Sequence, residues 1–473
     1  MLRVCGRVSR GAIPLRGSRI QCLSTSSVLF ATKIPVQKQG KTRSSFSPTK
    51  QQTKVKKGGM THLTFKDAVT EMGFEKLAGE LTVEALSASN VSNLGSSVVK
   101  YSPESLSKLN MLKAFKPYQH HELFQSPITL VSQNTTKLYN DFIQNLNEKS
   151  SGQNRWCLTG EKGSGKSTLL SQSIALASSK YDDLIVLHLD RPENIVNGTS
   201  DYIFNQKLNK YQQPMFTKRW IWKLKNANEA IFKKLKLSKD IQFQTKRVDH
   251  SLKKGENTVY DLLQMNHDFG KFAPTTAFQF LVEELVHHSA TVPVLVSLDN
   301  VNGIINTPIT KYKTPEFEPI HVSDFEMGDF FLKLASGELS FAKGGVLMSD
   351  TSDFAKHSKT LAVALGTEQY DPYSKKEFFD LGIANRLLSN GGITRFAVEN
   401  LSKEESTSLL KFYKDNEILQ VRQYPTKETL KEGNPQTKDD FDAEAQFEKL
   451  VNNHFTVSAG NPGYLLKTAV LNY

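Results

Sequence analysis

Short apolar runs bounded by polar or turn-forming residues recur along the chain and predict the strands of a sheet. They lie at 155–159, 184–189, 294–298, 345–349 and 395–398. The segments between them have helical or loop character, and this alternation is expected of a parallel sheet covered by helices. The pattern predicts an α/β fold for residues 127–398.

Helical spacing dominates on both sides of these strands. Before them, Leu130, Leu138 and Leu146 fall on one face and predict a helix over 129–146. After them, Ser402 can cap a first turn and Glu405 can bond back to the Ser402 amide, which predicts a helix to about residue 415. Further helical segments near 441–454 and 463–472 complete a C-terminal helical domain over 399–473.

The region before the predicted sheet has a weaker pattern. Residues 61–126 carry mixed helical signals that are interrupted by Pro103 and Pro117. Because proline often marks a helix boundary, residues 31–126 are interpreted as a basic tail followed by an extended N-terminal arm.

Positive charge is concentrated at the N-terminus. The formal net charge is +12, but the first 66 residues contain 14 Lys or Arg and no acid, which leaves −2 for residues 67–473. Spaced arginines in a Ser-rich segment without acids are typical of a mitochondrial transit peptide, which we assign to residues 1–30. The alternative is a disordered basic arm that grips RNA. No apolar run reaches the roughly 18 residues of a membrane span.

A phosphate-binding motif follows the first predicted strand. Its residues are Gly160, Glu161, Lys162, Gly163, Ser164, Gly165, Lys166, Ser167 and Thr168, which match G-x-x-x-x-G-K-[ST] at each fixed position. Glycines let successive amides face an anion, Lys166 can reach the β and γ phosphates, and Ser167 can complete the shell of a magnesium ion. The motif predicts a P-loop that holds a purine nucleoside triphosphate with Mg.

Two strand ends supply the remaining candidate residues. Asp299 ends the buried strand 294–298 and is the predicted second magnesium ligand beside Ser167. Asn300 follows it at the position where many ATPases carry a glutamate base, and an amide can orient water but cannot take its proton. Ser349 could contact the γ-phosphate or water. With Asn300 and Ser349 as the catalytic candidates, hydrolysis is expected to be slow or absent.

Residues 201–254 form a basic insertion rich in aromatic residues. The segment holds 14 Lys or Arg against 4 acids. Lysine and arginine beside aromatics suit an RNA surface, where phosphates are neutralised and unpaired bases stack. The alternative is an amphipathic helix whose stripe, from Trp220 to Ile231, faces the core.

Several ordered motifs together resemble one known family. They are GEKGSGKST at 160–168, YQQP at 211–214 leading to Trp220, LDNVNGI at 298–304, GGVLMSDTS at 344–352 and NP at 461–462. From about Ser126 onwards the chain resembles the death-associated-protein family, the P-loop GTP-binding protein of the mitochondrial ribosomal small subunit.

This resemblance implies an AAA- or STAND-like P-loop NTPase fold with a C-terminal helical lid. It implies GTP or GDP with Mg as the ligand, ATP being possible, with residues 160–168 on the phosphates and Ser167 and Asp299 at the metal. Relatives with an active lid often show Gly-Asn-Pro-Arg, whose arginine senses the γ-phosphate, whereas here Gly463 follows Pro462. The departure favours bound nucleotide as a structural element.

The resemblance also implies a place in the cell and a set of partners. The expected location is the mitochondrial matrix, in the small subunit of the mitochondrial ribosome, with its rRNA and proteins as partners and residues 201–254 as the contact surface. The alternatives are an active matrix ATPase or GTPase of the AAA type and a signalling switch of the STAND type.

Overall fold

The structure is a computed structural model that describes residues 83–124, 126–244, 249–265, 276–351, 359–373, 379–419 and 443–471. The predicted transit peptide and basic tail lie outside these ranges. Among the residues described, no helix has both the length and the apolar character needed to cross a membrane.

Five parallel strands form the sheet that the sequence predicted. In chain order they are β3 (Arg155–Thr159), β4 (Ile185–Leu189), β9 (Val294–Leu298), β12 (Gly344–Ser349) and β13 (Thr394–Ala397). Their order across the sheet is β13-β3-β12-β9-β4, and every neighbouring pair is parallel. The carboxyl ends therefore share one edge, which is where open α/β sheets bind ligands.

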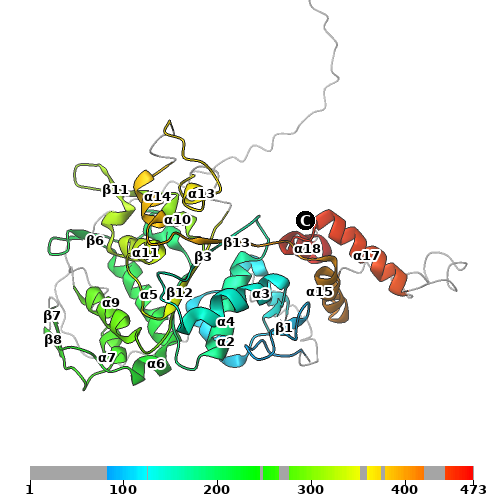
Figure 1. Cartoon of the computed structure of the whole chain (residues 1–473), viewed down its shortest axis with the longest axis horizontal. Coiled ribbons are helices and arrows are strands. Elements are labelled where there is room, and N and C mark those ends of the chain that lie inside the picture. The colour runs from blue at the N-terminus through cyan, green and yellow to red at the C-terminus, as the bar shows by residue number, and fades with distance from the viewer. Residues whose placement is uncertain are drawn as a thin grey trace, which may run out of the picture. The chain divides into compact units, whose positions relative to one another are not determined.

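Alternate side chains of the strands enter two different cores, one on each face of the sheet. Leu187 and Val296 belong to one core, and their chain neighbours Val186 and Leu295 belong to the other. The first core is covered by α5 (Pro214–Ala227), α9 (Ala277–His288) and α11 (Glu326–Ser336), and the second by α2 (Pro103–Leu112) and α4 (Lys166–Lys180) (Figure 1). Cover on both faces explains why these strands read as continuous apolar runs.

The longer connections carry smaller elements. They are β5 (Ile203–Asn205), β6 (Lys210–Gln212), α6 (Glu229–Lys234), β7 (Ile241–Gln244), β8 (Asp249–Leu252), α7 (Val259–Gln264), α10 (Asn302–Ile305), β10 (Ile309–Lys313), β11 (Pro319–His321), α13 (Thr360–Ala364) and α14 (Leu381–Leu388). The strands of these connections form the antiparallel pairs β5-β6, β7-β8 and β10-β11, which lie outside the main sheet.

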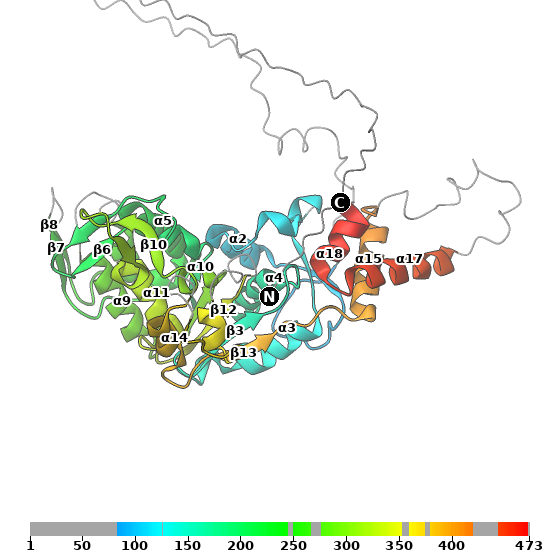
Figure 2. The same cartoon turned by 90° about the horizontal axis from the view of Figure 1, so that it is seen from above.

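The described part of the N-terminal arm is folded, in contrast to the extended arm that the sequence predicted. β1 (Val98–Lys100) is followed by α2, which packs against α4 and α5, as Figure 2 shows for α4. Pro103 is the first residue of α2, and the Ser102 side chain accepts a hydrogen bond from the Ser105 amide. Proline at this position starts a helix instead of breaking one, because the first amides of a helix lack an internal partner anyway.

The helix predicted over 129–146 begins later than expected. Thr129 and Leu130 belong to β2 (Ile128–Leu130), which pairs antiparallel with β1. The helix starts at Gln133 as α3 (Gln133–Leu138), where Ser132 forms the cap, and continues as a π turn and a 3-10 turn to residue 147. The apolar spacing gave the buried face correctly, but pairing with β1 takes the first residues into a strand.

The C-terminal helical domain has the elements that the sequence predicted. α15 (Lys403–Asp415) begins with the predicted capping box, in which the Glu405 amide donates to Ser402 and the Ser402 amide donates to the Glu405 carboxylate at 2.9 Å. α17 (Ala443–Ser458) and α18 (Pro462–Leu466) follow. Leu410, Val451 and Leu465 share a core that also receives the partly buried Phe124 of the arm. The arm and this domain are therefore packed together.

A buried arginine ties the start of β3 to two helices. Arg155 is only 1% exposed, and no ion pair to a carboxylate is found for it among the residues that the structure describes. Its guanidinium donates to four carbonyl oxygens, those of Gly152 (2.9 Å), Ala335 (3.0 Å), Ser389 (2.9 Å) and Asn390 (2.7 Å). Two of these residues follow α14 and one lies in the last turn of α11, so the cation also satisfies a helix C-terminus.

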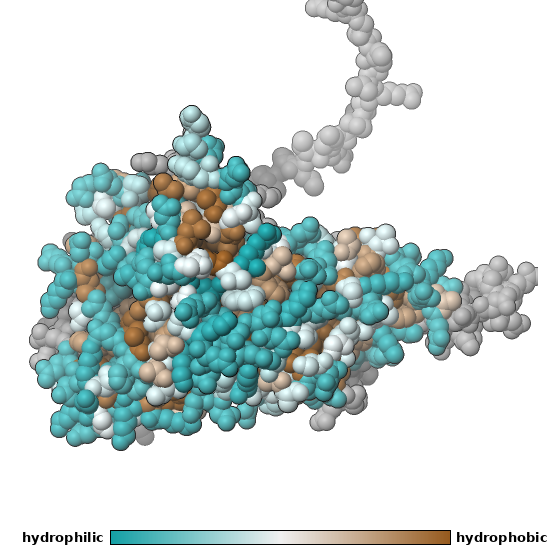
Figure 3. Space-filling model, viewed as in Figure 1, coloured by the Kyte–Doolittle hydropathy of each residue, from teal (hydrophilic) through white to brown (hydrophobic). Residues whose placement is uncertain are grey.

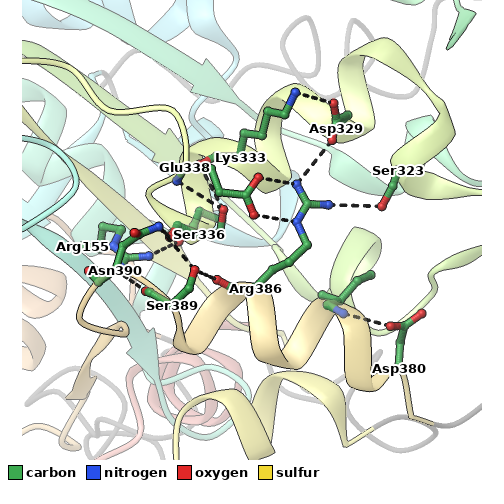
Figure 4. A network of polar contacts seen from close by, with 12 residues as sticks. Arg155, Ser323, Asp329, Lys333, Ser336, Glu338, Asp380, Arg386, Ser389 and Asn390 are labelled. Carbon is green, nitrogen blue, oxygen red and sulfur yellow. Dashed lines mark hydrogen bonds and ion pairs between the residues drawn. The ribbon is translucent and has the colours of Figure 1, made fainter. Parts of the chain in front are cut away.

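A second arginine joins the same two helices from their outer side. Arg386 of α14 forks onto Glu338 at 2.8 and 2.9 Å and reaches Asp329 of α11 at 3.3 Å (Figure 4). Lys333 binds the other oxygen of Asp329 at 2.8 Å. This bond holds down the pKa of the Asp329 carboxyl despite its partial burial.

Hydrophilic residues cover most of the face seen in Figure 1. Brown areas break this cover in several separate places, one of them over α10, α13 and α14 (Figure 3). Leu381 and Leu388, at the two ends of α14, are 44% and 49% exposed. Nothing in the described residues shows what covers them.

Replacing Arg155 with methionine should destabilise the fold, because four carbonyl oxygens lose their common donor while the side-chain volume is largely kept. We expect a loss of roughly 3 kcal/mol, seen as a fall of about 5 °C or more in Tm. Arg219→Met, at an exposed position of α5, is the matched control and should leave Tm within about 1 °C. Equal melting of the two variants would contradict the assigned role.

Candidate functional site

The phosphate-binding motif forms the turn between β3 and α4. β3 ends at Thr159 and α4 begins at Lys166. Gly163 and Gly165 have φ angles of +88° and +98°, in the left-handed region that favours glycine. Because Gly165 is the N-cap, no side chain caps the first amides of this 15-residue helix. The positive end of α4 is thus directed at the turn, as an anion site requires.

Lys166 is buried inside the turn. Its Nζ donates to the carbonyl oxygens of Gly160 at 2.6 Å and Glu161 at 2.7 Å, and it lies 3.5 Å from Asp350 Oδ1. Burial raises the pKa of the Asp350 carboxyl, and the nearby Lys166 opposes this rise. The sequence analysis missed Asp350, although it follows β12 in the same way that Asp299 follows β9.

The structure brings together the two predicted magnesium ligands. The Ser167 hydroxyl donates to Asp299 Oδ1 at 3.1 Å, and Asp299 is only 2% exposed. The same oxygen accepts from the Ser349 hydroxyl at 2.6 Å. Hydroxyl and carboxylate oxygens are the donors that magnesium prefers, so this pair fits the ion by its chemistry.

The two weak catalytic candidates have other partners here. Ser349 is fully buried, its hydroxyl donates to Asp299, and it accepts from the Asn300 amide at 3.1 Å. Asn300 has a φ of +61°, and its side-chain amide donates to the Glu193 carboxylate at 3.1 Å. Ser349 therefore orients the Asp299 carboxylate. Asn300 is hydrogen-bonded to Glu193, a residue that was not predicted from the sequence.

The N-terminal arm reaches the motif, which the sequence did not predict. The Tyr118 and Ser167 hydroxyls lie 3.1 Å apart, and the Gln119 side-chain amide donates to the Thr168 hydroxyl at 3.1 Å. Lys116 Nζ lies 2.8 Å from Asp299 Oδ2. Of these three arm residues only Lys116 is charged, and nothing in the sequence distinguishes it from the other lysines of the chain. The contact could therefore not be predicted from the sequence.

The C-terminal domain touches the motif from the other side. The Asn461 side-chain amide donates to the Lys162 carbonyl at 3.0 Å, and the Gly463 amide donates to the Gly163 carbonyl at 3.0 Å. A Cβ at Gly463 would lie 2.9 Å from the Gly163 Cα. The close backbone contact therefore excludes a side chain at the position where relatives with an active lid carry arginine.

A cavity of about 490 Å³ lies between these parts. The motif residues that line it are Lys162, Gly163, Ser164, Gly165, Lys166, Ser167 and Thr168. It is also lined by His121 and Phe124 of the arm and by Tyr413 and Leu466 of the C-terminal domain. Burial lowers the pKa of His121 to about 4, so its ring is neutral at physiological pH. The size of the cavity and its mixed polar and apolar lining fit a nucleotide.

Most of the chain matches one known protein family. The family model of the mitochondrial ribosomal death-associated protein 3 matches residues 129–468. The chain belongs to this family. The match confirms the resemblance inferred from the motifs, together with the predicted localisation to the mitochondrial ribosome.

Two fungal relatives are similar over most of their length. The small ribosomal subunit protein mS29 of Schizosaccharomyces pombe is 28% identical over 373 residues, which cover 76% of this chain and 74% of the relative. The protein of the same name from Neurospora crassa is 26% identical over 363 residues, covering 70% and 69%. The family match starts at residue 129, so the arm that reaches the motif lies before it.

The basic insertion carries less unpaired charge than its lysine and arginine content indicates, because several of its lysines pair with acids, all of them except Glu229 outside residues 201–254. The pairs are Lys210–Asp329, Lys223–Asp190, Lys233–Glu229, Lys234–Asp183, Lys239–Glu283 and Lys253–Glu256. The predicted core stripe is confirmed, since Trp220, Leu224 and Ile231 are buried, whereas Trp222 is 49% exposed. One face of α5 is therefore buried in the core, while Trp222 lies on its exposed face.

A groove of about 770 Å³ runs between α2 and α5. The described residues that line it include seven Lys or Arg and one acid, Asp190. Arg219 and Lys225 of α5 and Trp222 between them belong to this lining. Part of the positive charge of the insertion therefore lines this concave surface, together with Lys113, Lys116 and Arg191 from outside the insertion.

Adding a methyl group at Gly463 should disturb the contact between the C-terminal domain and the motif. We expect Gly463→Ala to lower stability by roughly 1–3 kcal/mol and to weaken nucleotide binding, because the new Cβ meets backbone atoms that cannot rotate away. Gly463→Arg should be worse, even though it restores the arginine of active relatives. Melting and nucleotide titration measure both effects.

Gly95→Ala is the control for this prediction. A Cβ at Gly95 meets no described atom within 4 Å. The substitution should therefore change neither Tm nor nucleotide affinity. If Gly463→Ala behaves like Gly95→Ala, the close backbone contact does not matter.

Proposed function

We propose that the chain is a structural component of the mitochondrial small ribosomal subunit that supports translation and retains a purine nucleotide with Mg at its P-loop. The names of the two fungal relatives support the ribosomal part of this function. The nucleotide part rests on one observation, the meeting of Lys166, Ser167 and Asp299 at the carboxyl edge of the sheet. The strand order and the helical domain over the cavity support a P-loop NTPase fold of the AAA or STAND type.

In the proposed function, the residues of the motif bind the nucleotide and do not hydrolyse it. The amides of the turn and of the first turn of α4 would hold the phosphates, with Lys166 neutralising their charge. Ser167 and Asp299 would hold the magnesium ion, which shields the phosphate charge when bound. A ligand that binds only the folded protein stabilises it, so the nucleotide would brace the arm, the sheet and the C-terminal domain.

We propose that the purine base of the nucleotide packs against the apolar residues of the cavity lining. Phe124, Tyr413 and Leu466 offer a surface for a purine ring. The neutral His121 ring has two buried nitrogens with no hydrogen-bond partner among the described residues, and a base edge could supply one. GTP or GDP is the proposed ligand, following the family resemblance.

Slow hydrolysis is a second candidate function. Glu193 is the specific observation in its favour, because its carboxylate lies 3.1 Å from the Asn300 amide and could take the proton that Asn300 cannot. Against it, the Asn300 backbone and side chain are both tied to neighbours, and Gly463 removes the sensor arginine. Retention of the nucleotide therefore remains the favoured function.

Protein purified from its native assembly should carry a nucleotide, and mass spectrometry of the released ligand identifies it. We expect a guanine nucleotide at close to one per chain, and at least a tenfold lower occupancy in Lys166→Ala, which loses the buried cation that faces the phosphates. Native protein without nucleotide would overturn the proposal. Sustained turnover above background that Lys166→Ala abolishes would favour the hydrolase instead.

The groove between α2 and α5 is the proposed contact surface for rRNA. Its basic residues can neutralise phosphates, and the half-exposed Trp222 offers a face on which an unpaired base can stack. The paired lysines of α6 are less suited, because Glu229 and Asp183 already neutralise Lys233 and Lys234. The proposed rRNA contact surface therefore includes only part of the basic insertion, the residues that line the groove.

Reversing two charges in this groove should weaken ribosome association. For Arg219→Glu combined with Lys225→Glu, we expect at least tenfold weaker co-sedimentation with mitochondrial small subunits near 0.15 M salt, and a shallower dependence on salt. Lys233→Glu combined with Lys234→Glu makes the same change in net charge outside the groove and should have a smaller effect. Equal effects would indicate that only the net charge matters.

A further inference from the structure

A lysine from the N-terminal arm lies at the carboxylate that the magnesium ion would share. Lys116 Nζ is 2.8 Å from Asp299 Oδ2 and donates to the Asp190 carbonyl at 2.5 Å. The side chains of Lys116 and Asp299 are 11% and 3% exposed. A pair this deeply buried interacts much more strongly than a surface salt bridge, because water screens it poorly.

The bonds of the Asp299 carboxylate leave little room for a second cation. Oδ1 already accepts from the hydroxyls of Ser167 and Ser349, and Oδ2 accepts from Lys116. An ion that binds between Ser167 and Asp299 would lie a few ångströms from an ammonium group. Two positive charges at that separation in a buried site repel each other strongly. Close binding of both the ammonium and a divalent metal to Asp299 is therefore unfavourable.

We propose that Lys116 is a resident counter-cation of the nucleotide site and competes with Mg²⁺ for Asp299. This inference rests on the proposed nucleotide site and adds to it a residue that sets its metal dependence. With Lys116 in place, part of the positive charge near the phosphates comes from the protein itself. The chain can then hold a nucleotide with little help from a divalent metal.

The arm is anchored so that this competition affects its position. Tyr118 and Gln119, two and three residues after Lys116, contact Ser167 and Thr168 of the motif. A metal that displaces Lys116 must therefore also disturb these contacts or stretch the lysine side chain away from them. Metal binding and arm docking are opposed in this arrangement.

The test compares nucleotide affinity with and without metal in the full chain. A fluorescent guanosine diphosphate is titrated in EDTA and in millimolar Mg²⁺, and the ratio of the two Kd values measures metal dependence. We expect a small ratio for the unmodified chain. In Lys116→Met, affinity in EDTA should fall about tenfold or more, because no cation replaces the ammonium, while affinity in Mg²⁺ should stay the same or improve.

Two further variants make the result specific. Lys116→Arg keeps the charge and should keep the small ratio. Lys137→Met removes a lysine that is 52% exposed on α3 and should also leave the ratio unchanged. If Lys116→Met fails to fold, Lys116→Gln, which can still donate to Asp299, carries the same comparison.

The outcomes separate this inference from the proposed function. If the chain binds nucleotide and the ratio is the same in Lys116→Met, the competition is refuted while the nucleotide site stands. If neither the unmodified chain nor any variant binds nucleotide in either buffer, the proposed function fails, and the inference fails with it.

Discussion

The Asp299 carboxylate is the contact on which the rest of the site depends. A buried charge is costly unless it is paired and hydrogen-bonded, and every partner of this one comes from a different part of the chain. Ser349 ends a neighbouring strand, Ser167 lies in the first turn of α4, and Lys116 belongs to the arm. If any one of these three partners is lost, the buried Asp299 carboxylate is left with too few hydrogen bonds or charge partners. The stability of the arm, the motif and the sheet therefore depends on the same carboxylate.

The C-terminal domain contributes through its backbone. In a lid that senses the γ-phosphate, a long cationic side chain must project toward the ligand, which requires space between lid and motif. Here the Gly463 amide bonds directly to the Gly163 carbonyl, and that space is closed. The missing arginine is thus a consequence of tight docking, and tight docking suits a component that keeps its ligand better than one that cycles.

The sequence was informative where a pattern is local and repeated. Five strands, the motif, Asp299 and the capping box at Ser402 all follow from spacing within about ten residues, and the structure has them where they were predicted. It was uninformative where a role depends on distant partners. Lys116 looks like any other lysine until folding places it beside Asp299, and Pro103 looks like a helix breaker until the Ser102 cap is seen.

The charge count failed for the same reason. Net charge along a segment ignores acids contributed by other segments, and Asp183, Asp190 and Asp329 neutralise lysines of the insertion from outside it. Part of the remaining positive charge lines the groove between α2 and α5. Lys116 lines that groove, while Tyr118, two residues on, lines the nucleotide cavity. Under the assignments proposed here, one short segment separates the two ligands. If a movement of this segment couples the two sites, the coupling changes the affinity for each ligand by the same factor, because binding free energies are reciprocal.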